Sequence, residues 1–145
     1  MLVIDGRDGI YRELEFRNDV IPLIEVDGEV YVIVKPLVQQ LGVSWAGQLV
    51  KLRASEVFGT VKITIKLDDR FRDYTCIPLM RLHDFLLSIN WRKIPVNKLA
   101  DENGKLFSVR RKVRIYEELF LQVLNEFHEG YSRDLQSLID IYQEA

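Results

Sequence analysis

Residues 35–53 have side chains and spacing that could read DNA. A short apolar pattern is followed by Gly42 and then by a second apolar pattern, which is the order found in a helix-turn-helix. Glutamine can pair with adenine through two hydrogen bonds, and lysine or arginine can neutralise phosphates. The polar residues that we assign to this element are Lys35, Ser44, Gln48, Lys51 and Arg53.

The following segment could place a basic hairpin beside these helices. Apolar and polar residues alternate from Val61 to Leu67, as in a half-buried strand. We expect a charged loop at 68–73 and a return strand from Tyr74 to Ile77. The cations that we assign to its polar face and tip are Lys62, Lys66, Arg70 and Arg72.

A second interpretation of residues 35–53 stays open. Two short helices joined by a glycine occur in many unrelated domains, and the bulky Trp45 stands where the second helix would begin. In that interpretation the segment is a plain helical hairpin with Trp45 in the core.

Another basic cluster stands at the start of a long helix that we predict from Ser108 to Glu129. Cations at a helix N-terminus oppose the helix dipole, at a cost of roughly a few tenths of a kcal/mol each. A phosphate, an acidic tail or the carboxylates of a partner would compensate, and a solvated face is the alternative. The residues of the cluster that we count as candidates for binding are Arg110, Arg111 and Arg114.

The sequence indicates no catalytic site. His83 and His128 are isolated and have no neighbouring nucleophile motif, and neither a phosphate-binding glycine loop nor a zinc-protease motif occurs. Cys76 is the single cysteine, so it cannot form an internal disulfide, and we expect a buried thiol in a strand. We therefore predict a protein that acts by binding, without a cofactor or a metal.

Charge is strongly segregated along a chain of ordinary composition. The 145 residues are 48% hydrophobic, which suits one folded core. Residues 1–34 hold 3 basic and 8 acidic residues, residues 35–116 hold 16 and 7, and residues 117–145 hold 1 and 7, giving net charges of −5, +9 and −6. The basic middle can attract phosphate or an acidic protein, or the opposite charges can meet within the fold or across an oligomer.

The order of the patterns predicts an α+β fold. It comprises two β-hairpins with a helix-turn-helix-like pair between them and a helical C-terminal end. The first hairpin spans Val20 to Val34 and turns at Asp27-Gly28, because both residues tolerate the positive φ of a type I′ turn.

We divide the chain into three parts. Residues 1–18 are expected to form a loose arm with at most a short strand around Tyr11 to Phe16, and residues 19–129 to form the domain. Residues 130–145 are expected to form a last helix that packs on the domain or on a second copy. No apolar run is long enough to span a membrane, and no signal peptide pattern opens the chain.

Several short motifs, in order from about Ile21 to Phe127, resemble the N-terminal domain of phage antirepressors of the P22 Ant type. They are Val30-Tyr31-Val32-Ile33-Val34-Lys35-Pro36, Leu41-Gly42-Val43-Ser44-Trp45 with Gln48 and Lys51-Leu52, Cys76-Ile77-Pro78-Leu79, Phe85-Leu86-Leu87-Ser88-Ile89-Asn90 and Val113-Arg114-Ile115-Tyr116-Glu117-Glu118.

The resemblance implies a regulator that binds a phage repressor and stops it from occupying its operators, in the cytoplasm of a bacterial host. The family is related more distantly to BRO-N domains of viral proteins, some of which bind DNA. It supplies no catalytic residues. In larger members a separate C-terminal domain follows, so a chain ending at Ala145 is expected to stand alone or to be a shortened form.

Two functions of different classes therefore remain. The first is a protein-binding regulator that sequesters a repressor, and the second is a DNA-binding regulator that uses the helix pair and the basic hairpin. A wide apolar stripe with Ile115, Leu119 and Leu124 also suits a homo-oligomer formed through the C-terminal helices, although a core within one chain explains the same pattern.

Overall fold

The computed structural model describes residues 2–16, 19–90, 118 and 121. The chain divides into two compact units, Met1–Phe85 and Leu86–Ala145. The predicted C-terminal helices, including the helix at 130–145, lie outside the described residues. The domain boundaries at residues 18 and 129 stay a prediction.

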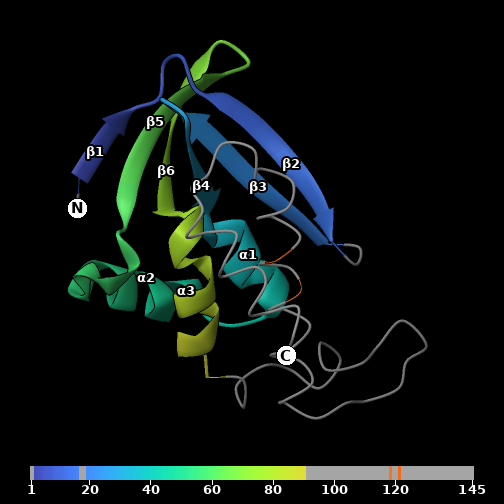
Figure 1. The fold of residues 1–145 in the computed structure, drawn as a ribbon, viewed down its shortest axis with the longest axis vertical. Helices are drawn as coiled ribbons and strands as arrows, with labels where there is room; N and C mark the ends of the chain where they lie inside the picture. The colour runs from blue at the N-terminus through green and yellow to red at the C-terminus, as the bar shows by residue number, and fades with distance from the viewer. Residues whose placement is uncertain (1, 17–18, 91–117, 119–120, 122–145) are drawn as a thin grey trace. The chain divides into compact units, whose positions relative to one another are not determined.

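A mixed β-sheet and three α-helices make up the described part, so the predicted α+β class is confirmed (Figure 1). The strands are β1 (Leu2–Asp5), β2 (Ile10–Phe16), β3 (Asp19–Val26), β4 (Glu29–Ile33), β5 (Val61–Leu67) and β6 (Arg70–Pro78). The helices are α1 (Val34–Leu41), α2 (Trp45–Ala54) and α3 (Leu82–Ser88), with 3-10 turns η1 (Glu56–Phe58) and η2 (Leu79–Arg81). The sheet order is β1-β5-β6-β4-β3-β2, with β1 parallel to β5 and the other pairs antiparallel.

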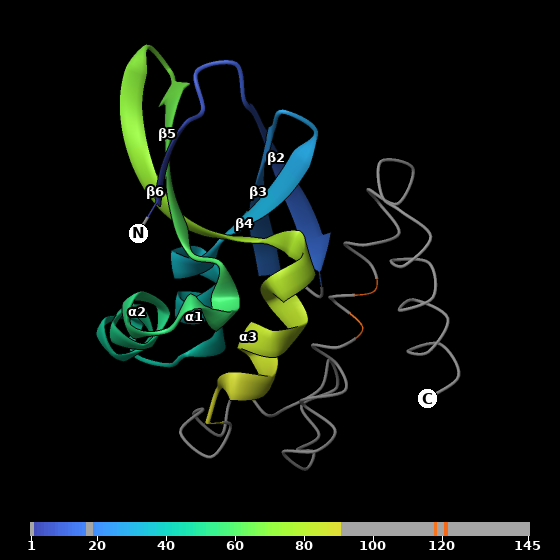
Figure 2. The same cartoon turned by 60° about the vertical axis from the view of Figure 1, so that its left-hand side comes forward.

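The sheet curls strongly, because a short link joins its two edge strands. β1 and β2 lie at opposite edges, yet only residues 6–9 separate them. A link of this length spans at most about 17 Å, whereas the edges of a flat six-stranded sheet lie about 24 Å apart. The edges must therefore approach each other at this end, as Figure 2 shows.

Two glycines make this link possible. The Gly6 amide donates to the Thr64 carbonyl at 2.7 Å, and the Gly9 amide donates to the Gly6 carbonyl at 2.8 Å. A Cβ on Gly6 would lie 2.7 Å from the Ile63 side chain and 2.8 Å from the Thr64 carbonyl oxygen. The backbone approaches β5 too closely for any side chain at this position.

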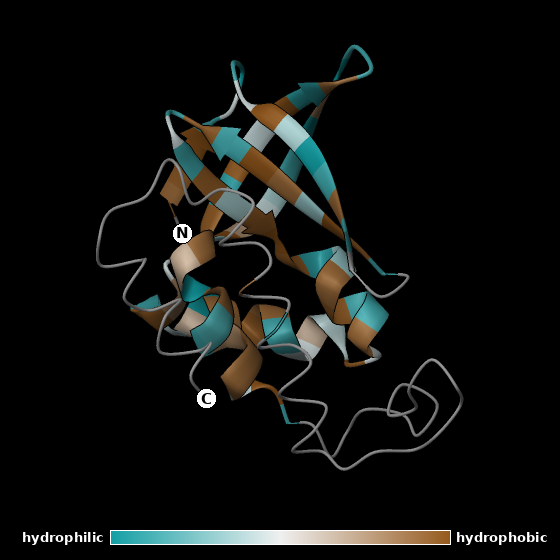
Figure 3. Cartoon of the chain, turned by 45° about the vertical axis from the view of Figure 1, so that its right-hand side comes forward, coloured by the Kyte–Doolittle hydropathy of each residue, from teal (hydrophilic) through white to brown (hydrophobic). Residues whose placement is uncertain are grey.

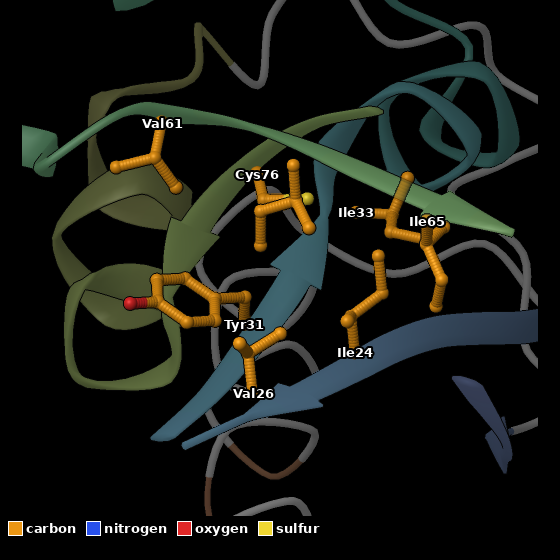
Figure 4. Packing of buried hydrophobic residues seen from close by; sticks show 8 residues of the cluster. Ile24, Val26, Tyr31, Ile33, Val61, Ile65 and Cys76 are labelled. Carbon is orange, nitrogen blue, oxygen red and sulfur yellow. The ribbon is translucent and has the colours of Figure 1, made fainter. Parts of the chain in front are cut away.

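The concave side of the sheet holds one hydrophobic core. Its members come from four strands, β3 to β6, and Figure 4 shows their packing: Ile24, Val26, Tyr31, Ile33, Val61, Ile63, Ile65 and Cys76. Cys76 is fully buried, as predicted from the sequence, and burial raises the pKa of its thiol to about 12.

The opposite side of the sheet packs against the helices. Alternate residues of β3 and β4, such as Leu23 and Val32, are paired in register and buried on this side. Helix α1, whose buried residues are Val34, Leu37, Val38 and Leu41, packs against β3 and β6. Figure 3 shows the resulting alternation of hydrophobic and hydrophilic residues along the strands.

Both of the hairpins predicted from the sequence turn through two residues with positive φ. Asp27 and Gly28 have φ values of 51° and 80°, so the predicted type I′ turn is confirmed. The charged loop predicted at 68–73 is wrong: only Asp68 and Asp69, with φ values of 50° and 61°, form the turn, and β6 already begins at Arg70. The aspartates tolerate this conformation, and strand pairing continues through charged residues because their side chains reach water.

The loose arm expected at residues 1–18 is also corrected. Residues 2–5 and 10–16 form β1 and β2, of which only β2 coincides with the short strand considered near Tyr11 to Phe16. The segment is polar because it supplies both edge strands, and an edge strand exposes much of its surface.

Gln40 of α1 completes the hydrogen bonding of β3 where β4 ends. Its side-chain amide accepts from the Val20 amide at 2.7 Å and donates to the Val20 carbonyl at 2.6 Å. The register of β3 and β4 would place residue 35 opposite Val20, but the chain is already helical there. The glutamine side chain therefore makes the two hydrogen bonds that a neighbouring strand would make with Val20, and it fixes α1 to the sheet.

We expect Gln40→Ala to lower the free energy of unfolding by about 1–2 kcal/mol, because it removes both hydrogen bonds to Val20. Gln39→Ala is the matched control, since Gln39 is exposed on the same helix, and it should change stability by less than about 0.5 kcal/mol. Urea unfolding followed by circular dichroism measures both. Equal effects of the two variants would contradict the strand-completing role.

A pair of glycine substitutions tests the curled sheet. Gly6→Ala should destabilise the protein by about 1–3 kcal/mol, because the new methyl group overlaps the backbone of β5. Gly47→Ala should be neutral or stabilise by up to roughly 1 kcal/mol, because Gly47 is helical and the added Cβ would lie in ordinary contact with Ser44, 3.9 Å from its Oγ. Thermal unfolding of both variants is the measurement. A harmless Gly6→Ala would show that the close approach is not required.

Candidate partner-binding surfaces

The predicted pair of short helices is present. α1 ends at Gly42, which has a φ of 82°, and the Ser44 side chain caps α2 by accepting from the Gly47 amide at 3.4 Å. Thr60 then donates to the Leu52 carbonyl at 3.1 Å and ties the end of α2 to the start of β5. The local geometry is that of helix, glycine turn and helix, while its use on DNA stays a prediction.

Lys51 is turned toward the protein. Its ammonium nitrogen lies 4.9 Å from the ring centre of Phe85 and 5.9 Å from that of Phe58. The two rings meet edge to face, with centres 5.8 Å apart. Partial burial lowers the pKa of Lys51. The side chain thus makes cation–π contacts with an aromatic pair beneath α2.

Gln48 is also drawn inward, one turn before Lys51. Its side-chain oxygen is buried and has no hydrogen-bond partner among the residues that the structure describes. The exposed side of α2 instead carries Gly47, Val50 and Arg53. Two of the side chains assigned to reading DNA are therefore partly enclosed, and Trp45 is half-buried as well.

The register of β5 and β6 separates the four cations predicted for one polar face. Lys62 pairs with Thr75 and Lys66 with Phe71, so both lysines lie on the convex face. Arg72 is paired with Ile65 and Arg70 with Leu67, on the concave side of the sheet. Directly paired residues project to the same face of a sheet, so the lysines and the arginines point in opposite directions.

The two lysines have contacts within the hairpin. Lys62 forms an ion pair with Asp73 at 3.2 Å, and Lys66 lies 5.9 Å from the ring centre of Phe71. Thr64 donates to Asp73 at 2.7 Å. The hydrogen bonds from Thr64 and Lys62 lower the pKa of Asp73.

The β5–β6 turn lies far from α2. β5 leaves the helical end of the unit at Val61 and turns after Leu67, and a strand of this length extends about 20 Å. Figures 1 and 2 show the turn at the opposite end of the sheet from α1 and α2. The helix pair and the hairpin tip therefore do not form one continuous surface of the first unit.

The remaining predicted residues fall into two groups. Lys35 and Arg53 are exposed on α1 and α2. The cluster of Arg110, Arg111 and Arg114 lies outside the described residues, as do the helices expected to support a homo-oligomer.

Phe71 is the surface residue that the sequence analysis missed. It is 64% exposed and is the only aromatic residue among the exposed large apolar side chains of the described part. It lies in the stretch Asp68 to Asp73, for which the many charged residues favoured a loop. A two-residue turn at Asp68 and Asp69 would place Phe71 opposite Lys66. This pairing is the signal that could have identified it.

Neither a metal-binding cluster nor a membrane-spanning helix is found among the described residues. No group of three or more histidine, cysteine, aspartate or glutamate residues among them could hold a metal ion. Within the same part of the chain, no helix is long and apolar enough to cross a membrane.

Comparison with known families identifies the chain. The P22_AR N-terminal domain matches residues 12–133, which include most of β2, strands β3 to β6 and all the described helices. The chain belongs to this family of phage antirepressor domains. No curated protein and no solved structure matches it.

A pair of substitutions on α2 of this antirepressor domain separates packing from surface charge. Lys51→Ala should lower the free energy of unfolding by about 1 kcal/mol, because it removes the contacts with Phe58 and Phe85. Arg53→Ala, an exposed control on the same helix, should change it by less than about 0.5 kcal/mol. Chemical denaturation provides the measurement. Equal stability of the two variants would show that Lys51 does not serve packing.

Proposed function

We propose that this domain binds a phage repressor protein and keeps it from occupying its operators. The observation that carries the proposal is the match of the antirepressor domain family over residues 12–133. The domain acts by binding and not by catalysis, and it works in the cytoplasm of the bacterial host.

The arrangement of the cations supports a protein partner over direct reading of DNA. A DNA-reading surface needs several cations that converge on one groove and its phosphates. Here Lys51 contacts aromatic rings, Lys62 is paired with Asp73, and the arginines of β6 point away from the lysines. Among the described residues, the cations of the basic middle are thus not all directed at one surface.

Direct DNA binding is the alternative, and one observation favours it. Lys35 and Arg53 are exposed on the two short helices, where the second helix is capped by Ser44. A DNA-binding domain of this design would place α2 against a groove, with these cations near the phosphates.

The test uses purified phage repressors, each bound to its own fluorescently labelled operator duplex. We expect the full chain to release at least one repressor, seen as a fall in anisotropy to the value of the free duplex. Failure to release any repressor at a large molar excess would contradict the proposed function.

The matched control is the same duplex without repressor, titrated at low and moderate salt. Under the proposal the chain leaves its anisotropy unchanged. Strong, salt-sensitive binding that weakens in Lys35→Ala/Arg53→Ala would favour the DNA-binding alternative, because loss of phosphate contacts lowers affinity for every sequence.

A further inference from the structure

The two edge strands of the curled sheet differ in how well they are protected against pairing with another strand. β1 lies at one edge and β2 at the other, and no strand of the described residues pairs with the outer side of either. An edge strand presents unpaired backbone N–H and C=O groups, so it can add a further strand. Charged side chains, above all lysine, and proline are the common protection against such pairing.

The sequence of β1 lacks this protection. The strand contains no lysine or proline, and three of its four residues are apolar: Leu2, Val3 and Ile4. Leu2 is 68% exposed and Val3 is 63% exposed, whereas Ile4 is half-buried against the core. β1 and β2 diverge from the link that joins them, which leaves the outer edge of β1 accessible within the described part (Figure 1).

A second copy of β1 fits this edge in an antiparallel register centred on Val3. A two-fold axis through the centre places Val3 opposite its own copy, and it places Leu2 opposite Ile4 of the other copy twice. The Val3 pair lies on the convex face, beside Lys62, and the two Leu2–Ile4 pairs lie on the concave face. All three pairs are apolar, and no like charges are opposed.

β2 does not fit its own copy in the same way. The registers that pair most of this strand are centred on Arg12, Glu13 or Leu14. The first opposes Arg12 to itself, the second opposes Glu13 to itself, and the third opposes Glu13 to Glu15 twice. Like charges directly opposite each other destabilise a pair of strands. The charges of β2 thus protect its edge against self-pairing, and β1 carries no such charges at its centre.

The charges beside β1 are already compensated. Asp5 forms an ion pair with Arg7 at 3.4 Å, and Lys62, next to Val3 on β5, forms one with Asp73 at 3.2 Å. Two copies therefore do not bring uncompensated charges together at this edge. A pair of four-residue strands buries much less than the roughly 1,200 Å² of a small stable interface, so the association is reversible and depends on concentration.

We propose that the outer edge of β1 pairs with β1 of a second copy of this chain and joins the two curled sheets into one. The occupant is a second copy because the register centred on Val3 is self-complementary and apolar, while β2 opposes like charges. The inference is independent of the proposed function, since it uses only the edge strands of the first unit.

Oxidative cross-linking of the full chain tests the register. Val3→Cys should form a disulfide between two copies, because the pairing places the two new thiols directly opposite each other. Asp5→Cys is the matched control on the same face of β1, since its two thiols would lie about 13 Å apart along the strands, beyond the reach of a disulfide. Cys76 is fully buried and does not compete. Non-reducing gels should show dimers of Val3→Cys forming at least roughly 10-fold faster, because the paired thiols meet at a high effective concentration.

Sedimentation velocity measures the same association without a cross-link. Val3→Lys should need at least roughly 10-fold more protein for half-maximal association, because it opposes two ammonium groups at the centre of the pair. Val57→Lys is the matched control, since Val57 is 58% exposed on η1 and outside the sheet, and it should associate as the unmodified chain does.

Three results would overturn the proposal. They are equal cross-linking rates of the two cysteine variants, unchanged association of Val3→Lys, and a chain that stays monomeric at every concentration. If the monomeric chain releases a repressor and Val3→Lys impairs that release, the edge receives the repressor instead of a second copy, while the proposed function stands.

Discussion

The link between β1 and β2 is the constraint on which the rest of the first unit depends. It joins the two edges of a six-stranded sheet through residues 6–9, so the sheet has to curl. Curling creates a concave interior, and strands from across the sheet fill it with one hydrophobic core. Gly6 permits the close approach, because any larger residue would overlap the backbone of β5.

The curl of the sheet also determines which side chains each face buries and which it exposes. Its concave side is occupied by side chains, while one part of its outer side is covered by α1 and another is exposed on β1, β5 and β6. Strand alternation then distributes the residues of the β5–β6 hairpin. Phe71 and Lys66 project outward, whereas Arg70 and Arg72 project to the other side. Each face of this hairpin thus carries only some of its charged residues.

On the helices, tertiary contacts engage polar side chains that the sequence alone would assign to binding a partner. Gln48 and Lys51 have the types and spacing of a DNA-reading helix, yet the Phe58–Phe85 pair lies beneath the ammonium group of Lys51. Phe85 stands 34 positions further along the chain, so no local pattern reveals that contact. Gln40 is similar, because its partner in β3 lies 20 positions earlier.

The sequence by itself determined the local features. It specified the Asp27-Gly28 turn, the burial of Cys76, the α+β class and the antirepressor family, because each depends on residue type or on neighbours close along the chain. Only the tertiary structure decided that residues 2–16 form edge strands and that the hairpin cations split between two faces. Strand pairing and register decided both, since they join residues far apart in sequence, and a polar edge strand looks locally like a loop.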